Sequence, residues 1–389
     1  MIKNRHIYLI QWLLCSILTM LCSACSSSDA EEGAMEASHK QPMMAIYVYA
    51  PEQAATAQKN ASQTRADVGE VDPITNEGTI KSLQIWVYES ETGNYVGYFS
   101  TNDVTALNEG HGTTYQIPVS DDFATNKPKV NVYAMANVTS ANCGVGTLNM
   151  ETTREAEALL NGAIITGHFG LGNLVKSVPD DGLPFAGQLT TQPVVGDAPT
   201  LRVGTLNAVS TVQLTRAVSK LRFVFAKTTG QPKVSINSIK MNAGMIPEVE
   251  YLFDKTQSLT YNEYEAELFS FIDDIAETTD PTDYIYFNQD AQEYENLINE
   301  AASKETPEVT VRGPIYLRES DKQLTGTITY TIGGEEKIAN FAMQQAGDFS
   351  RNHTWIVYAY YAGTGSLQVQ SLYVKDWSTK EMNYEYFNW

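Results

Sequence analysis

The chain has 389 residues, enough for about two domains, and 43% of them are hydrophobic, which permits an ordinary core. The formal net charge is −20, which argues against a nucleic-acid partner and predicts good solubility. The 22 tyrosines, together with frequent Val, Ile and Thr, favour a fold rich in β-strands.

The amino terminus has the pattern of an export signal. Lys3 and Arg5 precede an apolar stretch, residues 7–21, which is too short to predict a membrane span. Small residues then precede Cys25, a sequence that resembles the lipobox of bacterial lipoproteins. This resemblance implies that Cys25 is lipidated and that residues 1–25 form a signal peptide. An ordinary secretory signal cleaved nearby is the alternative. Residues 26–32 resemble the acidic tether that directs lipoproteins to the outer surface in Bacteroidetes.

The next stretch predicts a short β-strand on a loose tether. Apolar and tyrosine side chains alternate over residues 44–50, and Pro51 ends the run. The alternating part consists of Ala45, Ile46, Tyr47, Val48, Tyr49 and Ala50. Residues 52–63 have no apolar period, so a trypsin-like protease would reach Arg65 easily. We therefore predict that the strand is removable and that cleavage falls between Arg65 and Ala66.

The rest of the first half predicts strands with few helices. Alternation of apolar residues predicts strands over residues 82–88, 95–100, 115–119 and 130–138. A hairpin turn at 91–94 joins the first two. Residues 152–161 predict a helix, and the Gly- and Pro-rich residues 167–199 predict mostly loop.

A new series of strands begins after this loop. Residues 212–226 predict one long strand with 234–241 as its partner, so we place a domain boundary between residues 208 and 209. Later strands are predicted over 314–319, 324–332, 336–343, 354–361 and 367–374. Gly333 and Gly334 form the turn of a hairpin.

Residues 261–310 carry most of the charge, with fourteen acidic residues and one lysine, Lys304. Acidic clustering can indicate calcium, but no Asp-x-Asp-x-Asp-Gly loop occurs and the carboxylates are scattered. A solvated insertion with a helix near 290–302 is the better interpretation.

The sequence offers no pattern for catalysis or for a cofactor. The five histidines lie far apart, and neither a metal-ligand spacing, a nucleophile elbow nor a nucleotide loop is present. Three of the four cysteines lie in the first 25 residues, so Cys143 has no cysteine partner in the rest of the chain. A lone cysteine is more often a small buried residue than a reactive thiol. We therefore predict a protein that is not an enzyme and that binds no metal or cofactor.

Residues 382–389 form an aromatic tail. Met382, Tyr384 and Tyr386 fall on one face of a strand, and Phe387 and Trp389 fall on the other. Such a strand would be prone to aggregation if its edge stayed free. We expect it to have a defined binding place, either in its own sheet or in another molecule.

These motifs together resemble the FimA/Mfa-type fimbrillins, subunits of the type V pili of Bacteroidetes. The residues that carry the resemblance are spread along the chain: Cys25, 45–50, 64–66, 85–88, 132–137, 215–217, 221–223, 351–353, Val374, Trp377 and Trp389. Residues 244–310 do not take part in it. The resemblance implies an all-β fold with minor α content, built as two transthyretin-like Greek-key β-sandwich domains in tandem.

The resemblance also implies a division of the chain and a mode of assembly. Residues 26–65 would be a propeptide with the removable strand, 66–208 the amino-terminal domain and 209–389 the carboxyl-terminal domain. An arginine-specific protease would cut after Arg65, and the strand at about 380–389 of a neighbouring subunit would fill the vacated groove. The precursor would sit in the outer membrane by its lipid, and the product would be an extracellular fimbrium.

The role within a pilus follows from the two ends. A chain with both a cleavage site and a donor tail is best interpreted as a polymerising stalk subunit, whose partners are copies of itself and other fimbrial subunits. A tip or accessory subunit is the second interpretation. An alternative of another class is a monomeric surface lipoprotein that binds glycans, since tyrosine and tryptophan rings stack on sugars. Each of these interpretations is compatible with a ligand on a host or bacterial surface.

Overall fold

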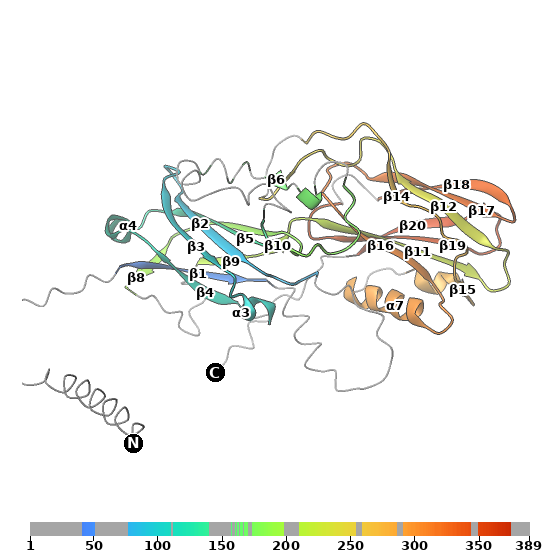
Figure 1. Cartoon of the computed structure of the whole chain (residues 1–389), viewed down its shortest axis with the longest axis horizontal. Coiled ribbons are helices and arrows are strands. Elements are labelled where there is room, and N and C mark those ends of the chain that lie inside the picture. The colour runs from blue at the N-terminus through green and yellow to red at the C-terminus, as the bar shows by residue number, and fades with distance from the viewer. Residues whose placement is uncertain are drawn as a thin grey trace, which may run out of the picture. The chain divides into compact units, whose positions relative to one another are not determined.

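We analysed a computed structural model of the chain (Figure 1). It describes residues 41–50, 77–109, 112–139, 157, 160, 162, 164–165, 167–169, 173–197, 210–253, 259–285, 291–343 and 349–374. Strands dominate these residues, which confirms the all-β prediction. No helix among them is both long enough and apolar enough to cross a membrane.

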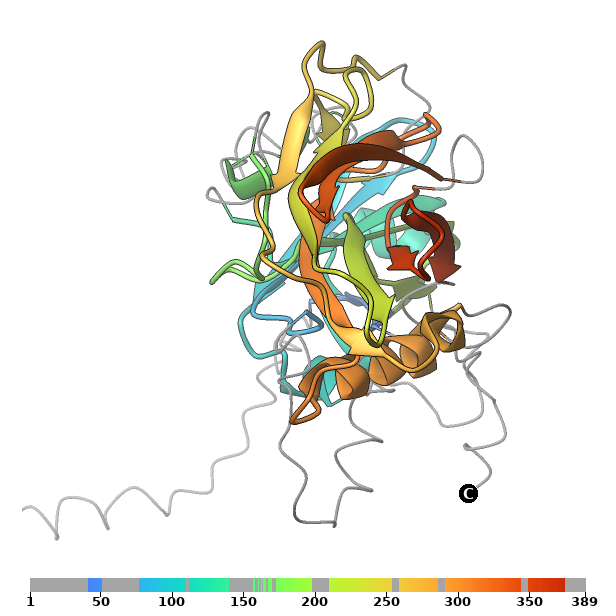
Figure 2. The same cartoon turned by 90° about the vertical axis from the view of Figure 1, so that its right-hand side faces the viewer.

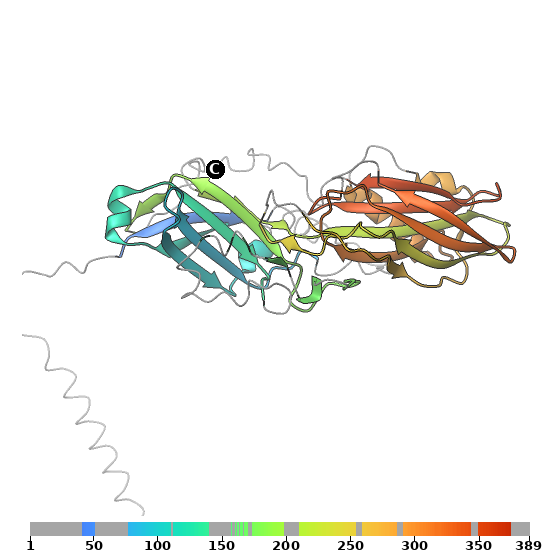
Figure 3. The ribbon, with the colours of Figure 1, turned by 90° about the horizontal axis from the view of Figure 1, so that it is seen from above.

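The first pair of sheets holds the strands from the amino-terminal half. One sheet contains β1 (Met43–Tyr49), β4 (Thr113–Pro118), β8 (Val194–Gly196) and β9 (Ser210–Gln213). The other has the order β10-β7-β5-β2-β3, with β10 (Thr215–Arg216), β7 (Phe185–Thr191), β5 (Val130–Ala136), β2 (Leu83–Glu89) and β3 (Tyr95–Thr101). Buried side chains of both sheets form one hydrophobic cluster. In Figure 3 the blue strand β1 lies among the cyan and green strands of this pair.

The second pair of sheets holds most strands of the carboxyl-terminal half and also packs around one hydrophobic cluster. One sheet contains β11 (Ser219–Thr228), β15 (Glu277–Thr278), β16 (Thr310–Leu317), β19 (Thr354–Tyr361) and β20 (Gln368–Val374). The other has the order β14-β12-β17-β18, with β14 (Ala266–Phe269), β12 (Val234–Met241), β17 (Thr325–Ile332) and β18 (Glu335–Ala342). Their facing side chains form a second hydrophobic cluster. A small ribbon pairs β13 (Glu250–Tyr251) with β6 (Ile164–Ile165).

Helices are short or lie on the sheets. Those whose bounds the structure describes are α3 (Thr105–Asn108), α4 (Asp121–Asn126), α7 (Ala291–Ser303) and the 3-10 turns η2 (Gly167–Phe169) and η4 (Pro281–Tyr284). The helix predicted at 152–161 lies mostly outside the described residues. Tyr294 and Ile298 of α7 are buried against Val224 of β11 and Ile356 of β19. Figure 2 shows α7, in orange, beside the strands of the second pair. The helix predicted near 290–302 is therefore confirmed, but the segment is partly a core element and not only a solvated insertion.

Several sequence predictions are confirmed closely. The strands predicted at 234–241 and 354–361 have these bounds in the structure, and β1, β2 and β3 differ by about one residue. Gly333 and Gly334 both have positive φ (59° and 90°), as a tight β-hairpin between β17 and β18 requires.

Three predictions are wrong. Residues 212–226 are divided among β9, β10 and β11, because the chain leaves the first pair of sheets after Arg216. Moreover β11 pairs with β15, β16 and β19 and not with 234–241, which pairs with β14 and β17. Residues 167–199 were predicted as mostly loop, yet β7 lies inside its sheet between β5 and β10.

The reason for the error at residues 167–199 is a close approach between sheets. Gly187 of β7 reads as a turn residue, but a Cβ there would lie 2.1 Å from the carbonyl oxygen of Gln213. Glycine is needed at this point because the strands come too close for any side chain.

Candidate functional site

The predicted removable strand forms β1, which lies inside a sheet and not at its edge. It pairs antiparallel with β4, where Met44 lies opposite Ile117 and Ile46 opposite Tyr115. On its other side it pairs antiparallel with β8 and parallel with β9. Removing β1 would therefore leave unpaired backbone N–H and C=O groups on both flanking sides, which is costly in a buried place.

The inward face of β1 is aliphatic. Met44, Ile46 and Val48 have no exposed surface and Ala50 keeps 4%, and all four belong to the first hydrophobic cluster. Each of the three larger side chains contributes about 1.5 to 3 kcal/mol through burial. This sum is comparable to the total stability of about 5 to 15 kcal/mol that a folded domain usually has.

The outward face of β1 carries two tyrosines. Their rings stack with centroids 6.3 Å apart, and the Tyr49 hydroxyl donates a hydrogen bond to Oε1 of Gln213 at 2.9 Å. Tyr47 lies directly against Gly112, where a Cβ would come within 2.0 Å of the ring hydroxyl. Burial raises the pKa of Tyr47, so its hydroxyl stays neutral at physiological pH.

A buried ionic cluster holds Glu77, which lies before β2 in the chain. Its carboxylate accepts from Lys220 Nζ at 3.0 Å and from the Tyr316 hydroxyl at 2.5 Å. Its carbonyl accepts from Nε of Arg216 at 3.1 Å. Lys220 also lies 2.9 Å from Glu295 of α7. Glu77 is thereby fixed to β10, β11 and β16, and Lys220 links it to α7.

The same cluster sets the charge of Glu295. Burial raises the pKa of this carboxyl, but the charges of Lys220 and Arg222 and their hydrogen bonds outweigh burial, and the net effect lowers the pKa. Glu295 is therefore ionised inside the protein. A buried group of this kind is stable only while its partners remain.

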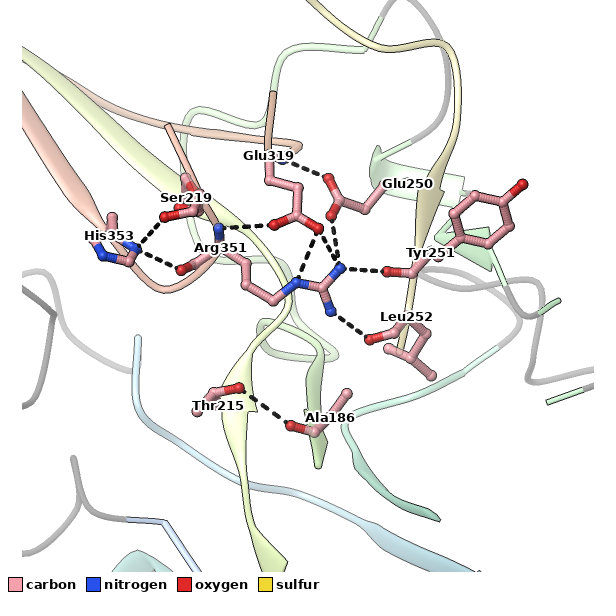
Figure 4. Close-up of polar contacts among 10 residues, drawn as sticks. Ala186, Thr215, Ser219, Glu250, Tyr251, Leu252, Glu319, Arg351 and His353 are labelled. Carbon is pink, nitrogen blue, oxygen red and sulfur yellow. Dashed lines mark hydrogen bonds and ion pairs between the residues drawn. The ribbon is translucent and has the colours of Figure 1, made fainter. Parts of the chain in front are cut away.

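A second polar cluster surrounds Arg351, whose motif takes part in the family resemblance (Figure 4). Its guanidinium donates to Glu319 Oε1 at 2.5 Å and to Glu250 Oε1 at 3.2 Å. It also donates to the carbonyls of Tyr251 at 2.9 Å and Leu252 at 2.8 Å. Arg351 thus ties the ribbon strand β13 to the turn before β19.

The two carboxylates of this cluster respond differently to burial. Burial, followed by the charge of Glu319, raises the pKa of Glu250 well above its usual range in spite of Arg351. Burial also raises the pKa of Glu319, but the hydrogen bonds and charge of Arg351 outweigh it and lower the pKa overall. Arg351 therefore favours the ionised form of Glu319, whereas burial keeps the protonated form of Glu250 favoured.

The structure describes only part of the predicted site. It contains the removable strand, with Ala45 through Tyr49 in β1 and Ala50 directly after it. The lipidation residue, the processing residues and the donor strand lie outside the described residues: Cys25, Arg65, Ala66, Met382, Tyr384, Tyr386, Phe387 and Trp389. Their roles stay predictions.

Sequence reasoning did not find the two ionic clusters. A signal was present, because Lys220 and Arg222 stand in an otherwise apolar strand, where cations need buried carboxylates. The partners Glu77 and Glu295 lie far away in sequence, so only the fold identifies them. Among the described residues, no group of three or more His, Cys, Asp or Glu side chains is placed to hold a metal ion.

Comparison with known proteins gives a family and several distant structures. The family model of the major fimbrial subunit protein (FimA) matches residues 54–235. A proposed cell adhesion protein of Parabacteroides distasonis is 12% identical, with a TM-score of 0.48 and coverage of 87% of this chain and 97% of that one. The C-terminally truncated tip fimbrial protein Mfa3 of Porphyromonas gingivalis is 12% identical, with a TM-score of 0.45 and coverage of 86% and 100%.

A fimbrial assembly protein of Parabacteroides distasonis is 13% identical, with a TM-score of 0.39 and coverage of 85% and 98%. No curated protein sequence matches the chain. The match to the family model covers a little under half of the chain. Residues 54–235 of this chain therefore match a family of fimbrial subunit proteins, in agreement with the resemblance found in its sequence.

Proposed function

We propose that this chain is a pilus subunit that is exported as a lipoprotein precursor, cleaved after Arg65 and joined to its neighbours by donor-strand exchange. Cys25 would carry the lipid that holds the precursor in the outer membrane. An arginine-specific protease would then release the segment that contains β1. The product would be part of an extracellular fimbrium that supports cell adhesion.

One observation carries the proposal: β1 fills an inner position of its sheet, yet its only forward connection contains the cleavable Arg65. Loss of β1 would remove three fully buried side chains and the backbone pairing with β4, β8 and β9. A replacement strand would recover both contributions by adding to the sheet. Because proteolysis is irreversible, the exchange would need no nucleotide.

We also propose that the two pairs of sheets are two transthyretin-like domains in tandem. The domains would span residues 66–208 and 209–389, with the donor strand at about 380–389. Strands β9 and β10 follow the proposed boundary in sequence but pair with β1 and β7. The first sandwich would therefore take its last strands from the second segment.

Cleavage and assembly can be tested together on the purified precursor. Cutting after Arg65 with an arginine-specific protease should yield a chain that begins at Ala66 and polymers visible by electron microscopy. Arg65→Ala should give lipidated monomers that neither lose β1 nor accept a neighbour. Lys59→Ala, which removes a different basic residue of the tether, is the matched control and should assemble normally. Fibres formed by the Arg65→Ala variant would refute the proposal.

The other class of function, glycan binding by a lipidated monomer, predicts a different mature protein. Amino-terminal sequencing of the protein taken from cells should then find lipidated Cys25 and not Ala66. The tryptophans in the described residues give this alternative little support, because Trp86 and Trp355 are at most 1% exposed and offer no stacking surface.

The position in the pilus is a further choice. The cleavage site together with the aromatic tail favours a stalk of like subunits. A tip or accessory position, between unlike neighbours, is favoured by a specific observation: the inward side chains of β1 are smaller than those of the tail.

A further inference from the structure

The space that β1 fills is narrow on both of its long sides. On the β4 side, a Cβ on Gly97 of β3 would lie 2.6 Å from Cγ2 of Ile117. On the β9 side, a Cβ on Gly187 of β7 would lie 2.1 Å from the Gln213 carbonyl oxygen and 2.9 Å from Val212. On either side of β1 the two sheets thus approach so closely that a Cβ at Gly97 or Gly187 would clash.

These close approaches limit what can lie between them. Met44, Ile46 and Val48 occupy this slot without exposed surface, so a larger side chain in their place would have to fit entirely inside the core. Widening this slot would require the two sheets to move apart at the contacts of Gly97 and Gly187. Protein interiors tolerate extra atoms poorly because their packing is already dense.

The tail repeats the spacing of β1 but not its volumes. Its sequence Met382-x-Tyr384-x-Tyr386 corresponds to Met44-x-Ile46-x-Val48, with a phenol ring in place of each β-branched side chain. The opposite face would put Asn383 and Glu385 inward, which buries a charge without a partner. Residues 375–389 contain no Ile, Leu or Val, so no other register supplies an aliphatic face.

We propose that the groove vacated by β1 takes a strand with aliphatic side chains at alternate positions, supplied by an unlike subunit, and discriminates against the tail of its own copies. This inference rests on the proposed donor-strand exchange and specifies its partner. The fitting strand resembles β1 itself, with Met-, Ile- and Val-sized groups inward. Outward, opposite Thr114, it carries an aromatic ring that packs on Gly112 as Tyr47 does.

The first test measures the fit without any exchange. Ile46→Tyr in the full-length precursor puts the ring of the tail into the slot, and Ile46→Leu is the control of similar volume. We expect Ile46→Tyr to lower the thermal midpoint by several degrees more than Ile46→Leu. Equal midpoints would show that the slot accepts rings and would overturn the inference, while leaving the proposed exchange intact.

The second test uses the full chain after cleavage at Arg65 and three peptides. One peptide has the sequence of residues 43–50, one that of residues 380–389, and one the latter sequence with Tyr384→Ile and Tyr386→Val. Fluorescence anisotropy should show the two aliphatic peptides binding at least about tenfold more tightly than the native tail.

The outcomes separate the two proposals. Equal or tighter binding of the native tail would overturn the inference but support exchange between like subunits. Failure of all three peptides to bind the cleaved chain would refute the proposed donor-strand exchange and, with it, the inference about its partner. As a further readout, Tyr384→Ile combined with Tyr386→Val in the full chain should form longer homopolymers than the wild type after cleavage.

Discussion

Lys220 has no exposed surface, and its charge is balanced by Glu77 and Glu295, each about 8% exposed. Taking one member from such a group leaves the others as uncompensated buried charges, which usually costs about 3 to 5 kcal/mol. Lys220→Ala should therefore lower the free energy of unfolding by about that amount, measured by urea denaturation. Lys233→Ala breaks an exposed ion pair with Asp273 and should cost at most about 1 kcal/mol. Similar losses in the two variants would contradict a structural role for the cluster.

Glu250 gives a pH-dependent contribution of definite sign. Its pKa is raised in the folded protein, first by burial and then by Glu319, above the usual 4.5. The fold therefore favours the protonated form. The stability due to this group is complete below pH 4.5 and is lost as pH rises toward the folded pKa.

The test compares thermal midpoints between pH 5 and pH 8. The thermal midpoint of the wild type should fall over this range. Part of this fall should be absent in Glu250→Gln, because glutamine cannot ionise but still accepts a hydrogen bond from Arg351. Glu335→Gln changes an exposed carboxylate and should leave the decline as in the wild type. An undiminished decline in Glu250→Gln would show that this carboxyl does not titrate there.

At the scale of elements, β1 is positioned by its outward side as well as by the core. Because Tyr47 lies on Gly112, the methyl group of Gly112→Ala would overlap the ring. We expect a loss of about 1 to 3 kcal/mol in the precursor, measured by chemical denaturation. In the background of Tyr47→Ala the same substitution should cost much less, since the ring is gone. An equal cost in both backgrounds would mean that the ring is not the obstacle.

The strands also show what a sequence can and cannot predict. Runs rich in apolar and aromatic residues predicted β1, β2, β12 and β19, although burial alternates mainly in β12 and β19 is buried on both faces. The same reasoning failed for β7, where Gly187 serves a contact with β9 that only the tertiary fold creates. It also joined β9, β10 and β11 into one strand, because a change of sheet leaves the alternation nearly unbroken.

The candidate site follows the same division. Strand β1 could be predicted from its own residues, but its neighbours β4, β8 and β9 come from distant parts of the chain. The slot's width depends on Gly97 and Gly187, neither of which belongs to the sheet of β1. Sequence therefore identified the strand, while its fit required the structure.

At the scale of the whole molecule, the two hydrophobic cores share elements. Tyr316 of β16 belongs to the first cluster, whereas its neighbours Ile315 and Leu317 belong to the second. Phe253 follows β13 and packs edge to face on Tyr133 of β5, with ring centroids 5.0 Å apart. Loss of order in either pair of sheets would thus remove buried contacts from the other.

This sharing predicts one cooperative unfolding transition for the chain. Trp86 lies in the first core and Trp355 in the second, so tryptophan fluorescence and circular dichroism should give coincident midpoints. Phe253→Ala removes a buried ring, which usually costs about 3 to 5 kcal/mol, and should lower and separate the two midpoints. Phe271→Ala is the matched control, because that ring is 60% exposed and should matter little. Separate transitions in the wild type would mean that the shared side chains do not couple the cores.

If the two cores are coupled, loss of β1 from the first pair of sheets should also destabilise the second pair. Cleavage should therefore lower the stability of the entire chain until a donor strand binds.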